Sequence, residues 1–336
     1  MTRYEKILGC LAGAAIGDAM GAATEIRTTE QIRERFGGYV VKMIDPPDDT
    51  FARNRKAGAI TDDFSQAYYI VNEIIRKNGK IDEEVGKTAI LRWWDDGIYN
   101  CFAGPTTRAS IQRLKGLSVE DEYTWILQNN SSATNGSAMK IGPVGLFTPD
   151  DPDRAIKNAY LICKATHNNN LSISGAAAVA AAVSNAMSGE ATIYSIVQAG
   201  LYGAREGFKI GSQKATNLAG PSVERRIELA VDIAIKSENP ADAMLAISDI
   251  VGTGLHISEA VPAVFGILVA ARGDFKDALF CAVNIGGDTD TIATMTGAIA
   301  GTLRGAGAID PDQIDLINRV NEISLEETAR TIEGLL

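Results

Sequence analysis

Apolar residues recur every three or four positions through most of the chain, and Ala, Leu, Ile and Met outnumber the β-branched runs typical of strands. This spacing predicts helices with one buried face, because 3.6 residues make one helical turn. We therefore expect an all-α protein. The expected helices cover residues 3–22, 62–77, 82–96, 105–115, 152–165, 172–187, 190–206, 223–237, 240–249, 258–270, 275–283, 289–304 and 325–334.

The longest stretches without this period are residues 26–60 and 128–150, which are rich in Gly, Pro, Asp and Asn. Neither stretch separates regions of different composition, so neither is predicted to link two domains. The 336 residues would suffice for two domains. The pattern nevertheless favours one domain over residues 1–336, in which long connections often carry function.

Two of the expected helices have small residues at every fourth position, which places these residues on one helical face. They are Gly9, Gly13, Gly17 and Gly21 in the first helix, and Ala293, Gly297, Gly301 and Gly305 near the end of the chain. Because glycine inside a helix costs about 1 kcal/mol relative to alanine, we expect very close helix packing to compensate. If the two helices pack on each other, polar residues from opposite ends of the sequence meet in space.

The composition indicates a folded protein without general affinity for nucleic acid. Apolar residues make up 46% of the chain and charged residues 22%, which is close to globular averages. The 32 Lys and Arg against 42 Asp and Glu give a net charge of −10, which repels phosphate backbones. We therefore expect no nucleic-acid partner, and we read the negative charge as a solubility feature or as part of a cation site.

The cysteines and the N-terminal segment indicate the cellular compartment. The N-terminal apolar run is interrupted by Asp18, with Glu5 where a signal peptide would be basic, and no uncharged stretch is apolar enough for a membrane span. We expect a cytoplasmic protein without membrane contact and make no prediction of its oligomeric state. The four cysteines lie among apolar residues with no CxxC pair, so we expect them to be reduced and buried: Cys10, Cys101, Cys163 and Cys281.

Two of the expected helices begin with acidic clusters, TDD at residues 61–63 and DTDT at residues 288–291. Thr and Asp cap helices, and acids in the first turn interact favourably with the helix dipole, so capping explains either cluster alone. Each cluster nevertheless has two carboxylates where one cap would suffice, and apolar residues or glycines precede both. Capping and metal binding therefore both stay open.

The two clusters predict a metal site if the two helix starts meet. Four carboxylates and two hydroxyls would then converge in a partly buried site, where they need positive charge nearby. A divalent cation supplies that charge. Since all the ligands are oxygens, with no His or Cys, Mg²⁺ or Mn²⁺ is favoured over Zn²⁺, and the ligand count allows two ions.

Other polar residues near these clusters are candidates of lower specificity. Asp18 and Glu25 extend the acid-rich end of the first helix, although each has an ordinary structural alternative. The only two histidines are His167 and His256, and an isolated His is more often structural than functional. The turn at residues 134–140, TNGSAMK, offers backbone N–H groups to a phosphate, although Asn-Gly is first of all a turn signal.

Seven segments, in order along most of the chain, carry a resemblance to a known family. They are GAAIGDAMGAATE near the start, AGAITDD, GPTTRASI at 104–111, NGSAMKIGPVGL at 135–146, ATH at 165–167, SEAVPA at 258–263 and GGDTDTIATMTGAIAG at 286–301. Together they resemble the ADP-ribosylglycohydrolase family, whose relatives include the dinitrogenase-reductase-activating glycohydrolases and the jellyfish J1 crystallins. The last segment is the most diagnostic.

The resemblance implies one all-α, orthogonal multi-helix domain with a dinuclear Mg²⁺ or Mn²⁺ site at the base of a cleft. It implies that Glu25 is the general acid or base, and we count Glu25 as catalytic together with two of the metal ligands, Asp62 and Asp290. The implied metal ligands are Thr61, Asp62, Asp63, Asp288, Asp290 and Thr291. The implied substrate contacts are His167, toward the ribose or leaving group, and a diphosphate-lining set of Asn135, Gly136 and Ser137.

Two aromatic residues depart from the family pattern. Phe64 follows TDD where many members have Thr or Ser, so we expect Phe64 beside the metals, stacking on a base or closing the diphosphate channel. Phe102 stands where some arginine-directed members have an Asp, which puts an arginine-linked substrate in doubt.

The expected function is metal-dependent hydrolysis of the glycosidic bond of an ADP-ribosyl group, carried by a protein or by a small molecule. One alternative is an enzyme that uses the same site on free nucleosides or other small N-ribosides. Another alternative, of a different class, is a non-catalytic, crystallin-like binding or structural protein. The complete set of implied ligands argues against the last of these.

Overall fold

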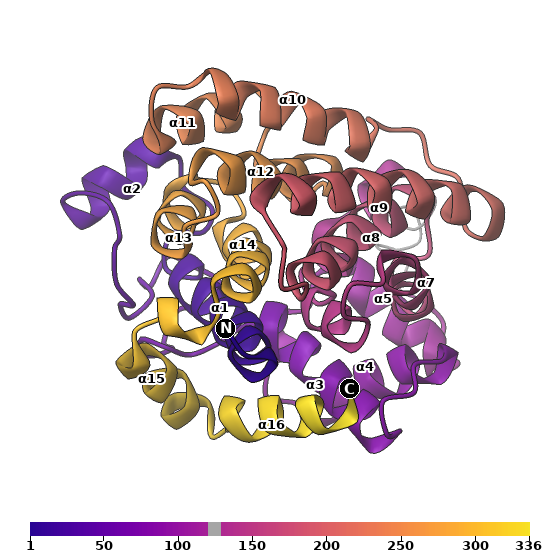
Figure 1. Cartoon of the computed structure of the whole chain (residues 1–336). Helices are drawn as coiled ribbons and strands as arrows, with labels where there is room; N and C mark the ends of the chain where they lie inside the picture. Colours follow the sequence, from indigo (N-terminus) through magenta and orange to yellow (C-terminus); the bar gives the residue numbers. More distant parts are fainter. Residues whose placement is uncertain (120–128) are drawn as a thin grey trace.

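Two helices from opposite ends of the chain lie side by side in the middle of the molecule. They are α1 (Arg3–Gly21) and α14 (Thr289–Arg304) in a computed structural model that describes residues 1–119 and 129–336 (Figure 1). The helices run antiparallel, because Gly9 faces Gly301 and Gly17 faces Ala293. A Cβ atom added to Gly9 would lie 2.1 Å from the carbonyl oxygen of Gly301. The close packing expected from the small-residue faces is confirmed.

The described residues form helices joined by loops and contain no strand, which confirms the all-α prediction. Two isolated bridges, Thr134 with His256 and Asn169 with Thr216, are the extended pairings in this part of the chain. The remaining α-helices are α2 (Thr29–Phe36), α3 (Asp62–Arg76), α4 (Glu83–Asp96), α5 (Pro105–Leu114), α7 (Pro152–Cys163), α8 (Asn170–Ala186), α9 (Ile193–Lys214), α10 (Val223–Lys236), α11 (Pro240–Ile250), α12 (Ile257–Ala270), α13 (Phe275–Asn284), α15 (Pro311–Asn321) and α16 (Leu325–Leu335). Short 3₁₀ helices are η1 (Asn100–Phe102), η3 (Asn130–Ser132), η4 (Asn135–Ser137), η5 (Gly142–Phe147) and η6 (Ala306–Ala308).

Three helices differ from the sequence prediction. Helix α2 lies inside the stretch 26–60 that was expected to be irregular, and α15 was not expected, because each buries only two residues and so shows little apolar period. Helix α9 ends at Lys214 instead of residue 206. Its last turns bury Gly207 and Gly211, which the apolar pattern did not mark. Of the second irregular stretch, 128–150, residues 129–150 are described and contain η3, η4 and η5.

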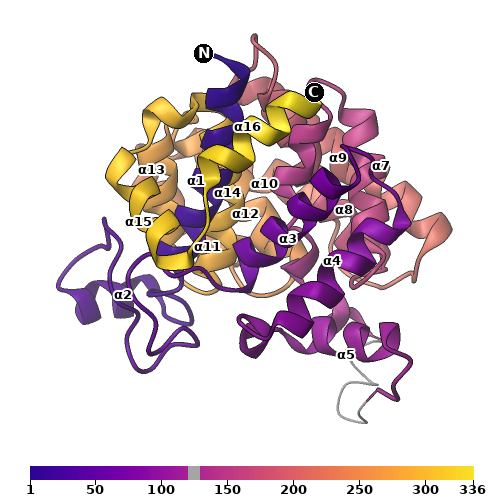
Figure 2. The same cartoon turned by 90° about the horizontal axis from the view of Figure 1, so that it is seen from below.

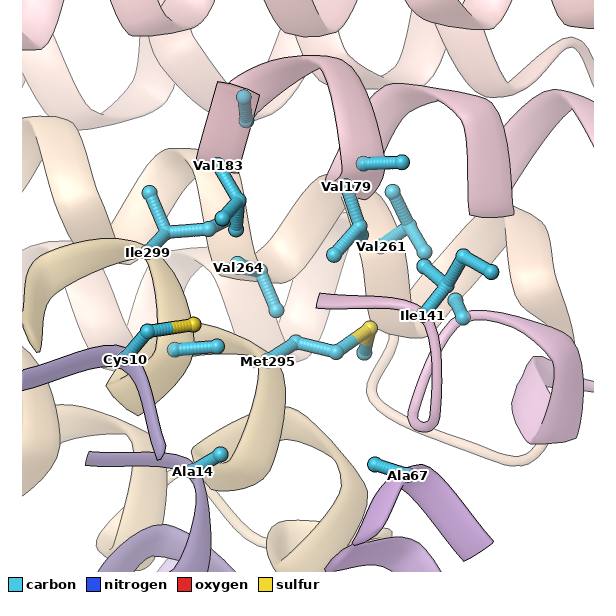
Figure 3. Close-up of a cluster of buried hydrophobic side chains, with 14 of the residues drawn as sticks. Cys10, Ala14, Ala67, Ile141, Val179, Val183, Val261, Val264, Met295 and Ile299 are labelled. Carbon is cyan, nitrogen blue, oxygen red and sulfur yellow. The ribbon is translucent and has the colours of Figure 1, made fainter. Parts of the chain in front are cut away.

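Branched and sulfur-containing side chains from three helices meet in the core. Figure 3 shows Val179 and Val183 of α8 facing Val261 and Val264 of α12, with Met295 of α14 between them and α1. All five are fully buried. Beyond this core, α10 and α11 cover α12 as an outer layer (Figure 1).

The cysteine prediction holds at three of four positions. Cys10, Cys163 and Cys281 are buried and reduced, whereas Cys101 is exposed. The difference arises because residue 101 lies in the 3₁₀ turn η1, which buries none of its residues.

The segments around α2 and α5 lie at the same end of the molecule, where α1 ends and α3 begins (Figure 2). This end holds the acidic clusters. None of the helices in the described ranges has the length and apolarity needed to cross a membrane.

Replacing Gly13 by Ala is expected to separate α1 from α14 and to lower the free energy of unfolding by about 1–3 kcal/mol, the usual cost of overpacking. The added Cβ would lie 2.1 Å from the carbonyl oxygen of Gly297. Gly334→Ala in α16 is the matched control, because nothing lies within 4 Å of its Cβ position and alanine favours the helix. Denaturant unfolding measures both variants, and equal stability loss in the two would contradict the close contact.

Candidate active site

A cleft of about 570 Å³ opens at the meeting point of the α3 and α14 starts. The predicted metal ligands and Glu25 all line it: Glu25, Thr61, Asp62, Asp63, Asp288, Asp290 and Thr291. The carboxylates of Glu25, Asp288 and Asp290 each place an oxygen within 4.8 Å of the other two. The helix packing therefore brings together acids that are far apart in the sequence.

Asp18 holds the start of α3 in place from below the cleft. Its carboxylate accepts hydrogen bonds from the backbone N–H of Thr61 (2.9 Å), the Thr61 hydroxyl (2.8 Å) and the backbone N–H of Phe64 (2.9 Å). Asp18 is fully buried and does not line the cleft. We therefore assign it a supporting role, in which it fixes the backbone that presents Asp62 and Asp63.

The start of α14 is shaped by a glycine turn. Gly286 and Gly287 have φ of 86° and 76°, and a Cβ on Gly287 would lie 2.5 Å from the carbonyl oxygen of Thr253. Both positions thus need glycine. The turn leaves the carboxylate of Asp288 without a capping bond to its own helix, and this carboxylate accepts a hydrogen bond from the Asn135 amide. Capping therefore does not explain Asp288.

The acids of the cleft raise one another's pKa values and have no ion-pair partner in the described residues. Burial, followed by the carboxylates of Asp288, Asp62 and Asp18, raises the pKa of Glu25 to about 8. Burial and Asp18 raise the pKa of Asp62 to about 8. In the described part of the chain, no Lys, Arg or His forms an ion pair with any acid of the cleft.

The donor set fits a hard divalent cation. The Oδ1 atom of Asp63 is buried without a hydrogen-bond partner, and burial together with Asp62 raises the pKa of Asp63 well above its usual value. The Thr61 hydroxyl donates a hydrogen bond to Asp18 and accepts one from the backbone N–H of Asp63, which leaves one lone pair on its oxygen for a cation. Carboxylate and hydroxyl oxygens are the ligands that Mg²⁺ and Mn²⁺ prefer. The acidic cluster can therefore hold a metal ion.

The predicted substrate contacts divide into two groups. Asn135, Gly136 and His167 line the cleft. Phe64 and Ser137 do not line it, and neither side chain is accessible. The expectations for these two residues are corrected: Phe64 points into the core toward Tyr68, and the Ser137 hydroxyl donates to the backbone carbonyl of Ser172.

The two histidines have different environments. His167 is buried, and burial holds its pKa well below the usual value, so the imidazole is neutral. His256 does not line the cleft, and its Nδ1 accepts a hydrogen bond from the backbone N–H of Ser258 at the start of α12. His256 therefore has a structural role at the start of α12.

Arg55 is a cleft residue that the sequence did not reveal, and it lies beside the aromatic residue Phe102. The guanidinium of Arg55 lies 5.6 Å from the ring centroids of both Tyr99 and Phe102, and Arg55, Phe102 and Thr134 line the cleft. Arg55 lies in a stretch without helical period, so no sequence pattern marked it. Thr134 immediately precedes the Asn-Gly turn, and its place in that turn was the one signal for it in the sequence.

Comparison with known proteins assigns the family. The family model described as ADP-ribosylglycohydrolase matches residues 1–335. The chain therefore belongs to the ADP-ribosylglycohydrolase family, as the sequence resemblance predicted, and is a glycoside hydrolase.

Relatives cover nearly the whole chain. The uncharacterized protein YegU of Escherichia coli (strain K12) is 31% identical over 334 residues, which are 98% of this chain and 97% of that protein. ADP-ribosylhydrolase ARH3 of Gallus gallus is 25% identical over 91% of this chain and 87% of its own length. ADP-ribosylarginine hydrolase Tri1 of Pseudomonas putida (strain GB-1) is 23% identical over 93% and 74%.

A solved structure supports the fold. The structure titled "ADP-ribosylglycohydrolase-related protein complex" superposes with a TM-score of 0.71 at 21% identity and covers 99% of this chain and 98% of that chain. At this identity the likeness establishes the all-α fold.

Asp18→Asn is expected to loosen the start of α3 and to lower the free energy of unfolding by about 1–3 kcal/mol, because the amide turns a donor toward N–H groups that need an acceptor. Asp274→Asn is the matched control, since Asp274 caps α13 through Asp277 N–H and Asn caps equally well. Denaturant unfolding of both variants tests this support, which is refuted if Asp18→Asn is as stable as the control.

The stability of the metal-free protein is expected to fall as pH rises. The pKa of Asp62 goes from 3.8 to about 8 on folding, so the folded chain binds protons more tightly and loses stability between these pH values. Millimolar Mn²⁺ should raise the melting temperature more at pH 8 than at pH 5, because deprotonated carboxylates bind the ion. Calorimetric melting with chelator or Mn²⁺ measures the effect, and an equal rise at both pH values would contradict it.

Proposed function

We propose that the chain hydrolyses the glycosidic bond of an ADP-ribosyl group, with two Mg²⁺ or Mn²⁺ ions held at the cleft floor. The observation that carries the proposal is the convergence of acids without ion-pair partners among the described residues in a cleft of about 570 Å³, which is within the usual size range of ligand pockets. The whole chain, residues 1–336, would act as one domain. The proposed ligands are Thr61, Asp62, Asp63, Asp288, Asp290 and Thr291.

The bound cations would orient ribose hydroxyls and stabilise the charge that develops at the anomeric carbon. Glu25 lies against this cluster. Burial and the neighbouring carboxylates raise its pKa to about 8 in the cation-free chain, and bound cations would lower that pKa, so Glu25 can then accept a proton from water. In the reaction, the bond from the anomeric carbon to the leaving group breaks and a bond to a water oxygen forms. Glu25 takes a proton from the water and passes a proton to the leaving group, so the acid is regenerated in its starting protonation state.

The names of the relatives support an ADP-ribosyl substrate. ARH3 is described as an ADP-ribosylhydrolase and Tri1 as an ADP-ribosylarginine hydrolase. We propose that this chain releases ADP-ribose from a protein or from a small molecule. Phe64 gave the nucleoside alternative its support, and its burial removes that support. A purely structural role does not account for uncompensated carboxylates in a cleft.

Release of ADP-ribose from ADP-ribosylated peptides with Mn²⁺ tests the proposal, with inosine as the nucleoside probe. Glu25→Gln is expected to lower kcat by about 10²–10⁴-fold, the usual share of general acid-base catalysis, while calorimetry still detects Mn²⁺ binding. Asp290→Ala is expected to abolish both turnover and Mn²⁺ binding. Asp249→Ala, on the exposed face of α11, is the control and should match the unaltered chain.

Two outcomes would overturn the proposal. One is release of ribose from inosine without release of ADP-ribose from any ADP-ribosylated peptide or small molecule. The other is turnover at the unaltered rate by Asp290→Ala after metal removal.

A further inference from the structure

Lys140 is a buried cation close to the cleft, yet it forms no ion pair in the described residues. Its side chain is 1% exposed. Its Nζ donates to Gln66 Oε1 (2.8 Å) on α3 and to Thr166 Oγ1 (3.1 Å) in the connection between α7 and α8. Burying an ammonium group is costly unless its N–H groups are hydrogen-bonded. The position of Lys140 therefore depends on these two hydrogen bonds.

The Thr166 hydroxyl links Lys140 to His167. Its oxygen lies 2.8 Å from His167 Nδ1 and makes no other hydrogen bond in the described part of the chain. An ammonium group can only donate, and a hydroxyl has one proton. The ammonium of Lys140 cannot accept the hydroxyl proton, and His167 Nδ1 is the one other partner of this oxygen in the described residues, so the proton is directed to His167 Nδ1. The neutral imidazole then carries its own proton on Nε2.

The second ring nitrogen of His167, Nε2, connects this hydrogen-bond arrangement to the cleft surface. Nε2 lies 2.8 Å from Thr134 Oγ1, so an Nε2–H donates to that oxygen. The Thr134 hydroxyl proton is then free to point away from the ring. Thr134 is half-buried and lines the cleft. Gly136 leaves room for the ring, because a Cβ there would lie 2.9 Å from His167 Nε2.

The same ammonium also orients an amide beside the acids. Lys140 binds the carbonyl oxygen of Gln66, so the amide nitrogen of Gln66 faces Asp62 Oδ2 at 3.4 Å. One buried cation thus sets hydrogen-bond directions toward Asp62 and toward Thr134, although Lys140 itself does not line the cleft.

We propose that Lys140 is a positioning residue that fixes His167 in the Nε2–H tautomer and thereby makes the Thr134 hydroxyl a hydrogen-bond donor to an acceptor oxygen of the substrate. The claim about the His167 tautomer concerns the protein without substrate and does not rest on the proposed function. The substrate contact rests on the proposed function, and ADP-ribose is the probe for it.

Nuclear magnetic resonance of the ¹⁵N-labelled full chain tests the tautomer directly. The chain has only two histidines, and His256 serves as an internal reference, because its Nδ1 accepts a backbone N–H. We expect protonated Nε2 on His167 in the unaltered chain and loss of this preference in Lys140→Met. The matched control is Lys6→Met, which removes another buried lysine, bonded to the carbonyl of Ala186 at the far end of α1.

Either of two outcomes of the nuclear magnetic resonance measurement would overturn the proposal. In one, His167 carries its proton on Nδ1 in the unaltered chain. In the other, Lys140→Met keeps the Nε2–H form. Equal changes in Lys6→Met would mean that any loss of a buried lysine perturbs His167, which also overturns it.

Calorimetric titration with ADP-ribose tests the contact at Thr134. Thr134→Val and Lys140→Met are each expected to weaken binding by about tenfold, the effect of losing one hydrogen bond, and the double variant is expected to lose no more than either alone. Fully additive losses would overturn the proposal. If ADP-ribose does not bind the unaltered chain, the proposed function fails, while the tautomer measurement still decides the role of Lys140.

Discussion

The site depends on the backbone contact between α1 and α14. Glycines let the two helices approach until the Cα of Asp290 lies beside Gly21, where a Cβ would come within 2.4 Å of it. No side chain stands between the helices at this point, so acids that follow α1 and acids that open α14 reach a common space. A bulkier residue on either face would move the carboxylates apart and leave the cleft without its floor.

This contact brings like charges together, and the surrounding chain holds them there. Asp18 and the Gly286-Gly287 turn fix the backbone on the two sides of the cleft, while the raised pKa values of Glu25 and Asp62 record the electrostatic cost. The folded state therefore favours protons or cations at this position. Structural stability and cation affinity are two aspects of one arrangement, since deprotonation destabilises the chain and simultaneously prepares the ligands.

Sequence reasoning identified the features that repeat or cluster locally and missed those that depend on neighbours in space. The glycine spacing in α1 and the acids of α3 and α14 were visible in the chain and fell where expected. Phe64 follows Asp63 directly, but successive helix residues point about 100° apart, so Phe64 turns into the core. Lys140 gave no signal because its role arises from contacts with two segments remote in sequence. Helices α2 and α15 were missed because they bury so few residues.

The pairing of α1 with α14 also constrains how the molecule can form. Helical proteins usually fold through contacts between neighbours in sequence, whereas this central pair joins residues near position 9 to residues near position 301, a separation that demands closure of almost the entire chain. During synthesis α1 cannot pack on α14 until α14 has left the ribosome. Until then its glycine face is uncovered, and the cleft has no floor on which a cation could bind.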